Sequence, residues 1–352
     1  MIVARRFRLS HAVVQRLHDA GLPVAKIFEQ ASVPASALAG PRVVLATAEL
    51  FAVYKAIAEH SDDPAIGLVI GSPGKLERYD PVALAGLSAR TFRDALERAS
   101  RYKLLTCPEQ IKVSVRGDEC RVQFDWLLAD EPEPPVLSDL CFAWVTELAR
   151  RGTANAVNPK RVELRRRPAA RARYKTYFGC PLVFGARADA LVFDRAALDH
   201  PFVTHNAELL AMVAPQLEAE LAEQAASESV REQVKWALKR TLAGRRPELG
   251  AVARELAIST RTLQRRLGEE RVTFQQVVAE ARRELARHYL SHSTLELDET
   301  AYLLGYEDAN SFFRAFHQWE GTTPGAWRKR TARRGSINSA LRAPSASLRA
   351  AS

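Results

Sequence analysis

Polar side chains that can form hydrogen bonds with DNA bases recur at two places near the end of this 352-residue chain. Arg261, Gln264 and Arg265 are spaced so that they share one face of a helix. Later in the chain, Asn310 and Arg314 have a helical spacing of four. Arginine can donate two hydrogen bonds to guanine, and asparagine or glutamine can pair with adenine in the major groove. These residue types therefore predict DNA recognition, with further arginines available for phosphate contacts.

A helix-turn-helix pattern positions each of these polar groups. In the first unit, an apolar face that includes Val252 and Leu256 ends at Ala257-Ile258-Ser259, and Leu263 and Leu267 then resume an apolar pair. The second unit repeats the first at an offset of 48 residues, which becomes 49 through one extra residue in the turn. The corresponding pairs are Leu256 and Leu304, Ile258 and Tyr306, Leu263 and Phe312, Arg265 and Arg314, and Leu267 and Phe316. A repeat of the whole unit is much less expected by chance than one unit.

A single long helix is predicted between the two units. The apolar residues from Phe274 to Tyr289 form one stripe, while Arg282, Arg283 and Arg287 project elsewhere. Two recognition helices that enter successive major grooves on one face of B-DNA must lie about 34 Å apart. A rigid helix of about four turns, together with the width of the units that it joins, can hold that spacing.

The segment from residue 305 to residue 328 contains the turn Gly305-Tyr306, the motif Phe312-Phe313-Arg314-Ala315-Phe316 and the ending Gly321-Thr322-Thr323-Pro324-Gly325-Ala326-Trp327-Arg328. With these features it resembles the signature of the AraC/XylS family of bacterial transcription regulators. The resemblance covers about residues 230–329. It implies two helix-turn-helix units that bind a bipartite, asymmetric DNA site.

The resemblance also implies site residues and partners. The expected partners are double-stranded promoter DNA, RNA polymerase and a small-molecule effector of unknown identity, with activation and a homodimer as family precedent. The positions that face DNA in the family are occupied here by Arg261, Gln264, Arg265, Asn310 and Arg314. The neighbouring outward residues complete the predicted DNA-binding site: Thr260, Thr262, Ser311 and His317.

Three residues depart from the family pattern. Arg271 stands where the turn after the first recognition helix usually has glycine, so a left-handed backbone there would cost free energy. His317 stands where lysine or arginine is common, and Phe313 replaces a small or polar residue on the DNA-facing side. These departures affect the strength and sequence preference of each half-site, but not the fold.

The segment from Ala83 to Leu96, followed by Arg101-Tyr102, resembles the N-terminal domain of ornithine-utilisation-type regulators of the same family. That domain is sometimes called arabinose-binding-like, a label that does not make the effector a sugar. The match covers about residues 9–221 and implies a sensing and dimerising domain. Spacing assigns no ligand-binding residue. Five aromatic residues suit either core packing or ligand contact: Tyr102, Phe124, Trp126, Phe142 and Trp144.

The positive charge of the chain is concentrated in its last third. Residues 1–230 contain 29 Lys and Arg against 28 Asp and Glu, whereas residues 231–352 contain 22 against 13. A basic module suits a polyanionic partner, because each cation that neutralises a phosphate releases condensed counterions. The alternative is a solvated basic surface, including a nonspecific tail that carries Arg333, Arg334, Arg342 and Arg349.

The chain is predicted to fold as an α+β protein. A mixed α/β domain for effector sensing and dimerisation, residues 1–225, precedes an all-α domain of two helix-turn-helix units joined by a long helix, residues 226–330. Residues 331–352 are expected to form a disordered basic tail. Within the first domain we expect helices over residues 9–60, 137–150, 171–178 and 207–223, a hairpin over 110–115 and 121–127, and strands over 161–165 and 190–193. The last of these helices carries an apolar stripe that suits either a dimer interface or the core: Leu209, Val213, Leu217 and Leu221.

Other kinds of chemistry have little support in the sequence. Cys107, Cys120, Cys141 and Cys180 lack the spacing of zinc sites, so no metal, disulfide or cofactor is expected. An enzyme, or a DNA-repair protein with the same DNA-binding module, stays an alternative. The candidate catalytic groups are a cysteine nucleophile with a histidine partner, or the carboxylate pair Asp62-Asp63. No nucleophile or phosphate-loop motif occurs, and the candidate histidines are scattered: His60, His200 and His205.

No apolar run is long enough to cross a membrane, because a charged residue interrupts every one of them. The first residues lack the apolar core of a signal peptide. We therefore expect a cytoplasmic protein without a membrane partner.

Overall fold

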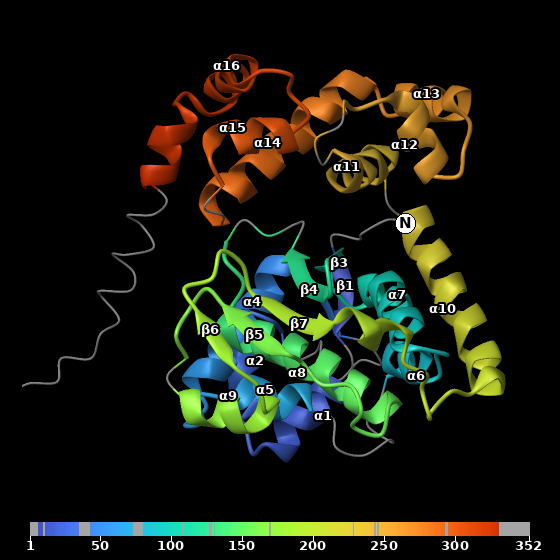
Figure 1. Cartoon of the computed structure of the whole chain (residues 1–352). Helices are drawn as coiled ribbons and strands as arrows, with labels where there is room; N and C mark the ends of the chain where they lie inside the picture. The colour runs from blue at the N-terminus through green and yellow to red at the C-terminus, as the bar shows by residue number, and fades with distance from the viewer. Residues whose placement is uncertain are drawn as a thin grey trace, which may run out of the picture.

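The computed structural model describes residues 6–9, 11–34, 43–72, 80–107, 109–126, 129, 131–168, 170–227, 229–242, 244, 246–292 and 295–330. An N-terminal domain of helices and strands lies below a helical domain in Figure 1, which confirms the predicted α+β class. The N-terminal helices are α1 (His11–Asp19), α2 (Val24–Gln30), α4 (Thr47–Glu59), α5 (Ile66–Gly71), α6 (Pro81–Leu87), α7 (Phe92–Tyr102), α8 (Pro135–Gly152), α9 (Arg171–Phe178) and α10 (Ala207–Ser227), with the short 3-10 helices η2 (Lys103–Leu105) and η3 (Arg195–Asp199). The tail expected over residues 331–352 lies outside the described residues.

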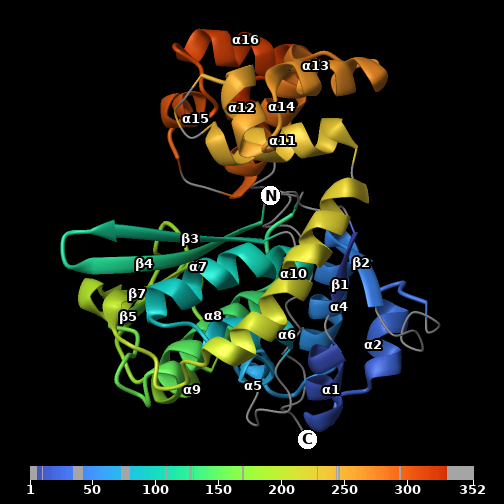
Figure 2. The same ribbon diagram turned by 90° about the vertical axis from the view of Figure 1, so that its right-hand side faces the viewer.

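A five-stranded sheet is the centre of the N-terminal domain. Its strands are β3 (Glu109–Arg116), β4 (Glu119–Trp126), β5 (Arg161–Leu164), β6 (Leu182–Phe184) and β7 (Ala190–Asp194), in the order β3-β4-β7-β5-β6. Strands β3 and β4 form the predicted hairpin, and Gly117 in its turn has the positive φ of 57° that a tight hairpin turn requires. Leu127, the expected last residue of that hairpin, lies outside the described residues. Figure 2 shows the hairpin extending away from the body of the domain.

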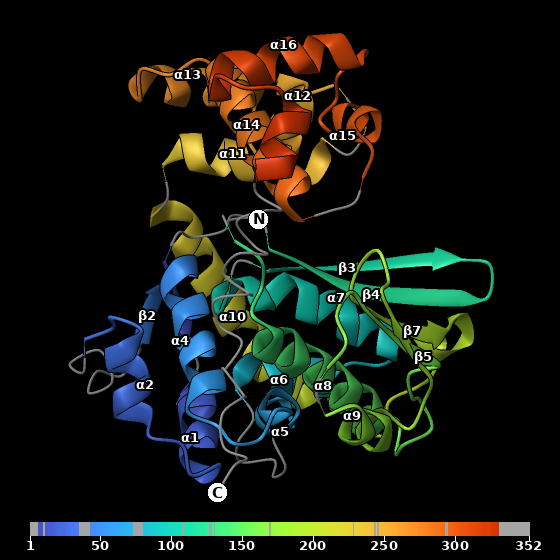
Figure 3. The same ribbon diagram turned by 90° about the vertical axis from the view of Figure 1, so that its left-hand side faces the viewer.

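A two-stranded sheet near the start of the chain corrects the all-helical expectation for residues 9–60. Strand β1 (Arg6–Leu9) pairs antiparallel with β2 (Val43–Ala46), and β2 lies beside α4 in Figure 3. In β2 the side chains of Val43 and Leu45 are buried and Val44 between them is exposed. This alternation is the strand period, but a run of four residues is too short for the period to stand out from the helical segments around it.

Helix α8 is the buried centre of the helical layer, and α5 packs against it at unusually close range. A Cβ atom added at Gly67 would lie 2.4 Å from the backbone oxygen of Val136, and one added at Gly71 would lie 2.5 Å from that of Leu140. Because side-chain atoms cannot approach backbone oxygens so closely, both positions require glycine. The arrangement brings the first half of the domain against the helix that supports the sheet.

Two apolar clusters form the core of the N-terminal domain. One joins α1, α2, α4 and β2 to the start of α8, and the other joins α7, α8 and α9 to the sheet. A separate cluster joins α6 and η2 to Leu217 and Leu221 of α10, and it includes Trp236 from the helical domain. The α10 stripe therefore contributes to core packing at these two positions, which is the second of the two roles considered for it.

The helical domain contains α11 (Val230–Thr241), α12 (Leu249–Glu255), α13 (Thr260–Glu269), α14 (Phe274–His292), α15 (Leu297–Leu303) and α16 (Ala309–Glu320). One apolar cluster includes residues from all six of these helices. Helix α14 is the long connecting helix predicted from the stripe, and Val277, Val278, Ala281 and Leu285 are buried along it. No helix in the described part of the chain is long and apolar enough to cross a membrane.

Candidate nucleic-acid interface

The first helix-turn-helix unit consists of α12 and α13. Val252 and Ala253 of α12 pack against Leu263 and Leu267 of α13, all four of them buried. The hydroxyl oxygen of Ser259 accepts a hydrogen bond of 3.1 Å from the backbone N–H of Thr262, so Ser259 caps the start of α13. The Ser259 cap and the buried pair Leu263 and Leu267 together determine which face of α13 is left for polar side chains.

The second unit, α15 and α16, is built in the same way. Phe312 and Phe316 take the buried places of Leu263 and Leu267. Asp308 caps α16 by accepting a 2.8 Å hydrogen bond from the backbone N–H of Ser311, and the hydrogen bonds from Ser311 lower the pKa of the Asp308 carboxyl. The repeated cap extends the sequence repeat to Ser259 and Asp308, which occupy matching positions.

Arginines of α14 hold the second unit in place. The guanidinium of Arg282 donates hydrogen bonds of 2.9 and 2.7 Å to the carbonyl oxygens of Leu304 and Gly305, and it lies 4.2 Å from the centre of the Tyr306 ring. These contacts give the turn of the second unit a direct support from the connecting helix. Sequence spacing showed only that Arg282 leaves the apolar stripe, and no local motif predicts a contact with a turn more than twenty residues away.

A second pair of α14 arginines binds the end of α16. Arg283 and Arg287 each donate a 2.7 Å hydrogen bond to Glu320, whose side chain is 4 % exposed. Burial alone would raise the pKa of Glu320, but the two arginines outweigh burial and lower it. The positive charges of Arg283 and Arg287 are therefore committed to an internal contact.

Helices α13 and α16 lie on one side of the helical domain. Figures 1, 2 and 3 all show these two helices on the side farthest from the N-terminal domain, with α11 on the near side. Seven of the nine predicted site residues are exposed: Thr260, Arg261, Gln264, Arg265, Asn310, Arg314 and His317. Thr262 and Ser311 are half-buried, and each forms a hydrogen bond with the side chain of its N-cap residue.

Two details of this surface were not foreseen. Phe313, expected to point outward, is half-buried and packs against the domain core and the ring of Phe312. Its aromatic surface therefore stabilises the unit more than it offers a face to a partner. Arg265 forms an ion pair with Glu269 one turn further along α13, so its guanidinium has a local partner in this state.

Arg271 has a left-handed backbone with a φ of 56°, as its place in the family pattern predicts. The turn after the first recognition helix thus has the conformation that usually calls for glycine. Such a conformation costs a residue with a Cβ atom roughly 1 kcal/mol or more. This strain lowers the stability of the first unit without changing its fold.

The cysteines give no support to a nucleophile. All four are free, and Cys107, Cys120 and Cys141 are buried. Burial raises the pKa of Cys107 to about 12 and that of Cys141 well above its ordinary value, so neither thiol ionises near neutral pH. The carboxylate of Asp63 is bound by Arg173 at 2.6 Å, and its neighbour Asp62 is exposed.

The two domains contact each other through α14. The ring nitrogen Nε2 of His288 lies 3.5 Å from the carboxylate of Asp125 on β4, which also pairs with Lys112 of β3. Burial would raise the pKa of Asp125, but His288 and Lys112 together lower it. No sequence pattern predicts this contact, because its partners are more than 160 positions apart and meet only through packing of the domains.

Comparison with known proteins matches both parts of the chain. The model of the arabinose-binding domain of AraC transcription regulators matches residues 21–202, which is more than half of the chain, and a helix-turn-helix domain model matches residues 252–330. The ornithine utilization regulator of Pseudomonas aeruginosa is 27% identical over 330 residues, covering 91% of this chain and 95% of that protein. An uncharacterised HTH-type transcriptional regulator of Mycobacterium tuberculosis is 28% identical over 320 residues, covering 89% and 93%. The crystal structure of the transcriptional regulator CdpR from Pseudomonas aeruginosa has a TM-score of 0.44 at 23% identity, covering 91% of this chain and 97% of that one.

Proposed function

This chain belongs to the AraC family of transcription regulators, and we propose that it reads a bipartite promoter site with α13 and α16 and controls transcription in response to a small-molecule effector. The observation that carries the proposal is that α13 and α16, whose long polar side chains are exposed, both lie on the side of the helical domain away from the N-terminal domain. A DNA duplex can approach that side without meeting the first domain. The unit that contacts DNA comprises about residues 226–330, and the sensing domain precedes it.

We assign base contacts to the long polar side chains on the two exposed faces. Arg261, Gln264 and Arg265 would read one half-site, and Asn310 and Arg314 the other. Arg265 must leave Glu269 to reach a guanine, at little cost because both partners are exposed. His317 and the residues at the helix starts would contact the sugar-phosphate backbone: Thr260, Thr262 and Ser311.

The remaining partners follow from the family. We propose that the protein activates transcription through RNA polymerase, works as a homodimer, has no catalytic activity and resides in the cytoplasm with its DNA. Since Leu217 and Leu221 belong to the core, the dimer needs another surface, and the exposed Met212 on the outer side of α10 is a candidate part of it. Light scattering of the full-length protein with and without DNA tests the dimer, and a monomer on saturated DNA would refute it.

Selection of genomic fragments by the purified full-length protein tests the main proposal. The enriched fragments are expected to share an asymmetric site whose two halves are centred about 10 base pairs apart, one helical turn. The double variant Arg265→Ala, Arg314→Ala should retain DNA without that enrichment. Retention of fragments by the unmodified protein with no shared sequence would contradict the assignment of α13 and α16 as recognition helices.

A further inference from the structure

A cavity of about 310 Å³ lies at the junction of the two domains. Strand β4 and the start of α8 form its N-terminal side, and His288 and Tyr289 of α14 form its C-terminal side. Phe124, Trp126 and Phe142 provide aromatic walls. The volume is at the low end of the range for small-molecule sites, which suits an amino-acid-sized ligand better than a large one.

Most charged side chains that line this cavity already have an ionic partner. The pairs are Lys112 with Asp125, Arg165 with Asp189 at 3.4 Å, and Glu131 with Lys55 at 2.6 Å. Two lining residues, Glu133 and Arg187, have no ion pair within the described part of the chain. The cavity therefore presents one acidic and one basic side chain that have no ionic partner among the described residues.

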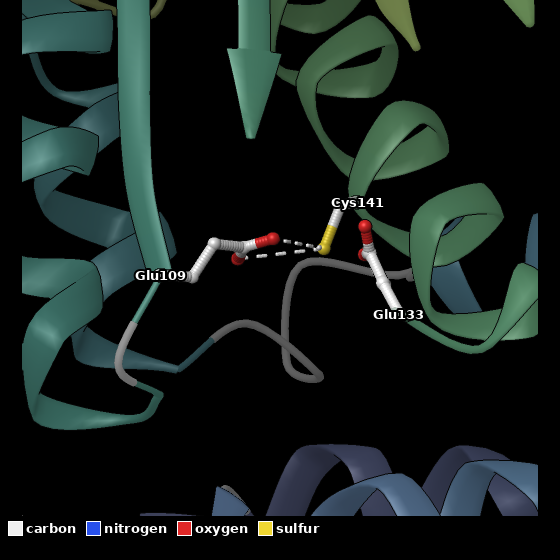
Figure 4. A group of neighbouring side chains, drawn as sticks. All are labelled: Glu109, Glu133 and Cys141. Atoms are coloured by element: carbon white, nitrogen blue, oxygen red, sulfur yellow. Dashed lines mark hydrogen bonds between the residues drawn. The ribbon is translucent and has the colours of Figure 1, made fainter. Parts of the chain in front are cut away.

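Of the two residues, Glu133 has the stronger need for a partner, because its carboxyl group is buried. Its Oε1 atom is buried and accepts no hydrogen bond from the described residues. Figure 4 shows its carboxylate pointing toward Cys141 and Glu109, and the ligand atoms of the three residues lie within 4.8 Å of one another. Burial, together with the negative charge of Glu109, raises the pKa of Glu133 to about 8. A buried carboxyl held in this way gains from any cation that reaches it.

A metal ion is a poor match for this cluster. The ammonium of Lys103 already pairs with Glu109 and donates a 3.3 Å hydrogen bond to the sulfur of Cys141, so a positive charge occupies the side of the cluster that a metal would need. Lys103 neutralises one of the two carboxylates. The second, Glu133, suits a monovalent organic cation that arrives through the cavity.

We propose that the cavity is the effector site and that it binds a small zwitterion, whose amine pairs with the carboxylate of Glu133 and whose carboxylate pairs with the guanidinium of Arg187. The aromatic walls favour an amine, since a cation gains from the face of an aromatic ring. A ligand in this position touches β4 and α14 together, so it favours the arrangement in which the helical domain is docked through His288 and Asp125. The inference rests on the proposed function, because it names the ligand of the sensing domain.

Thermal unfolding of the full-length protein tests the ligand class. The probes are the twenty standard L-amino acids and the short diamino acids, each beside the matched amine without a carboxylate and the matched acid without an amine. At least one zwitterion should raise the melting temperature, and its two matched single-charge analogues should need at least about tenfold higher concentration for the same shift.

Two variants locate the effect in the cavity. Glu133→Gln and Arg187→Gln should each raise the half-saturating concentration about tenfold or more, while Glu147→Gln on α8 and the exposed Arg167→Gln, both outside the cavity, should leave it unchanged. Glu133→Gln preserves the shape of the side chain, so the unliganded variant should unfold at or above the temperature of the unmodified protein.

Several outcomes would overturn the inference. They are the absence of a shift with every zwitterion, an unchanged response in Glu133→Gln, or a shift with zinc chloride alone that Glu133→Gln abolishes. Sequence-selective DNA binding measured in parallel separates the two proposals. A protein that selects its DNA site but ignores all zwitterions keeps the proposed function and refutes the ligand assignment, whereas one that binds a zwitterion but selects no DNA refutes the proposed function.

Discussion

Ala257 and Gly305 occupy the same position in the turns of the two helix-turn-helix units, and both have left-handed backbones, with φ of 54° and 70°. In the sequence repeat they stand between the matching pairs Leu256 with Leu304 and Ile258 with Tyr306. Glycine adopts this conformation without steric cost, whereas the Cβ atom of alanine does not. The second unit therefore has the residue that suits its turn, and the first unit is strained at the equivalent point.

Ala257→Gly is expected to stabilise the helical domain. Removing the Cβ atom relieves about 1–2 kcal/mol of left-handed strain, partly offset by about 0.5–1 kcal/mol for the greater freedom of glycine in the unfolded chain. The reciprocal change, Gly305→Ala, should destabilise the domain by about 1 kcal/mol. Denaturant unfolding of both variants measures the two effects, and a less stable Ala257→Gly protein would contradict the account.

Arg265→Ala and Arg314→Ala should each weaken specific DNA binding by about 1–3 kcal/mol and relax sequence preference in one half-site. The two residues are exposed at matching positions of the recognition helices. Binding to a library of sites measures both quantities. Arg254→Ala is the control, because Arg254 is exposed on α12, outside the recognition helices, and should leave preference unchanged. Wild-type preference in both test variants would mean that the DNA-facing surface lies elsewhere.

Glu320→Gln should lower the free energy of unfolding of the helical domain by about 1–2 kcal/mol at neutral pH, since a charged acceptor of two arginine hydrogen bonds is lost and those arginines are partly solvated. The pKa of Glu320 is lowered in the folded state from its ordinary 4.5. Its contribution is therefore complete above that value and disappears as the pH falls through the folded pKa. Unfolding measured from pH 7 to pH 3 should show wild type and variant converging at the acid end. A difference that is constant over this range would exclude ionisation of Glu320 as the cause.

Gly71→Ala should destabilise the N-terminal domain by about 2–3 kcal/mol or more, because the new methyl group would meet the Leu140 oxygen and the Ala143 Cβ atom within 2.6 Å. Gly86→Ala on α6 is the matched control. Its new Cβ atom would meet only the flexible end of Leu148 at 3.3 Å, and alanine is the better helix former by about 1 kcal/mol. Thermal unfolding distinguishes the two, and equal melting temperatures would show that α5 and α8 can separate at no cost.

A fragment that starts at residue 228 should fold and bind DNA without effector, since its core is formed by its own helices. Its affinity should fall with salt at a log-log slope of about −0.9 per phosphate neutralised, so that about six contacts lose roughly 10³ between 50 and 200 mM. Removal of residues 331–352 distinguishes DNA binding by the helical domain from DNA binding by the basic tail. Collapse of the slope, with no sequence preference in the shortened fragment, would assign the binding to the tail.

Local patterns account for the parts of the fold that sequence predicted well. The repeat placed Leu263, Leu267, Phe312 and Phe316 correctly in the core, because helical periodicity depends on near neighbours. The β1–β2 pair was missed because its strands are short and distant in sequence. Arg282 and the contact of His288 with Asp125 were also missed, since each depends on how separate elements pack. The cavity is formed by the same packing, so the aromatic residues Phe124, Trp126 and Phe142 could not be assigned to a ligand site in advance.

The shared core of the helical domain also constrains the promoter. Because one apolar cluster connects α11 through α16, a change in the separation of α13 and α16 would require this core to repack. One base pair inserted between the half-sites shifts the second half-site by about 3.4 Å and rotates it by about 34° around the duplex. The duplex itself would have to twist or bend to restore both contacts, at an energetic cost that depends on the sequence of the spacer. Base pairs that the protein never touches would thus contribute to the choice of its target.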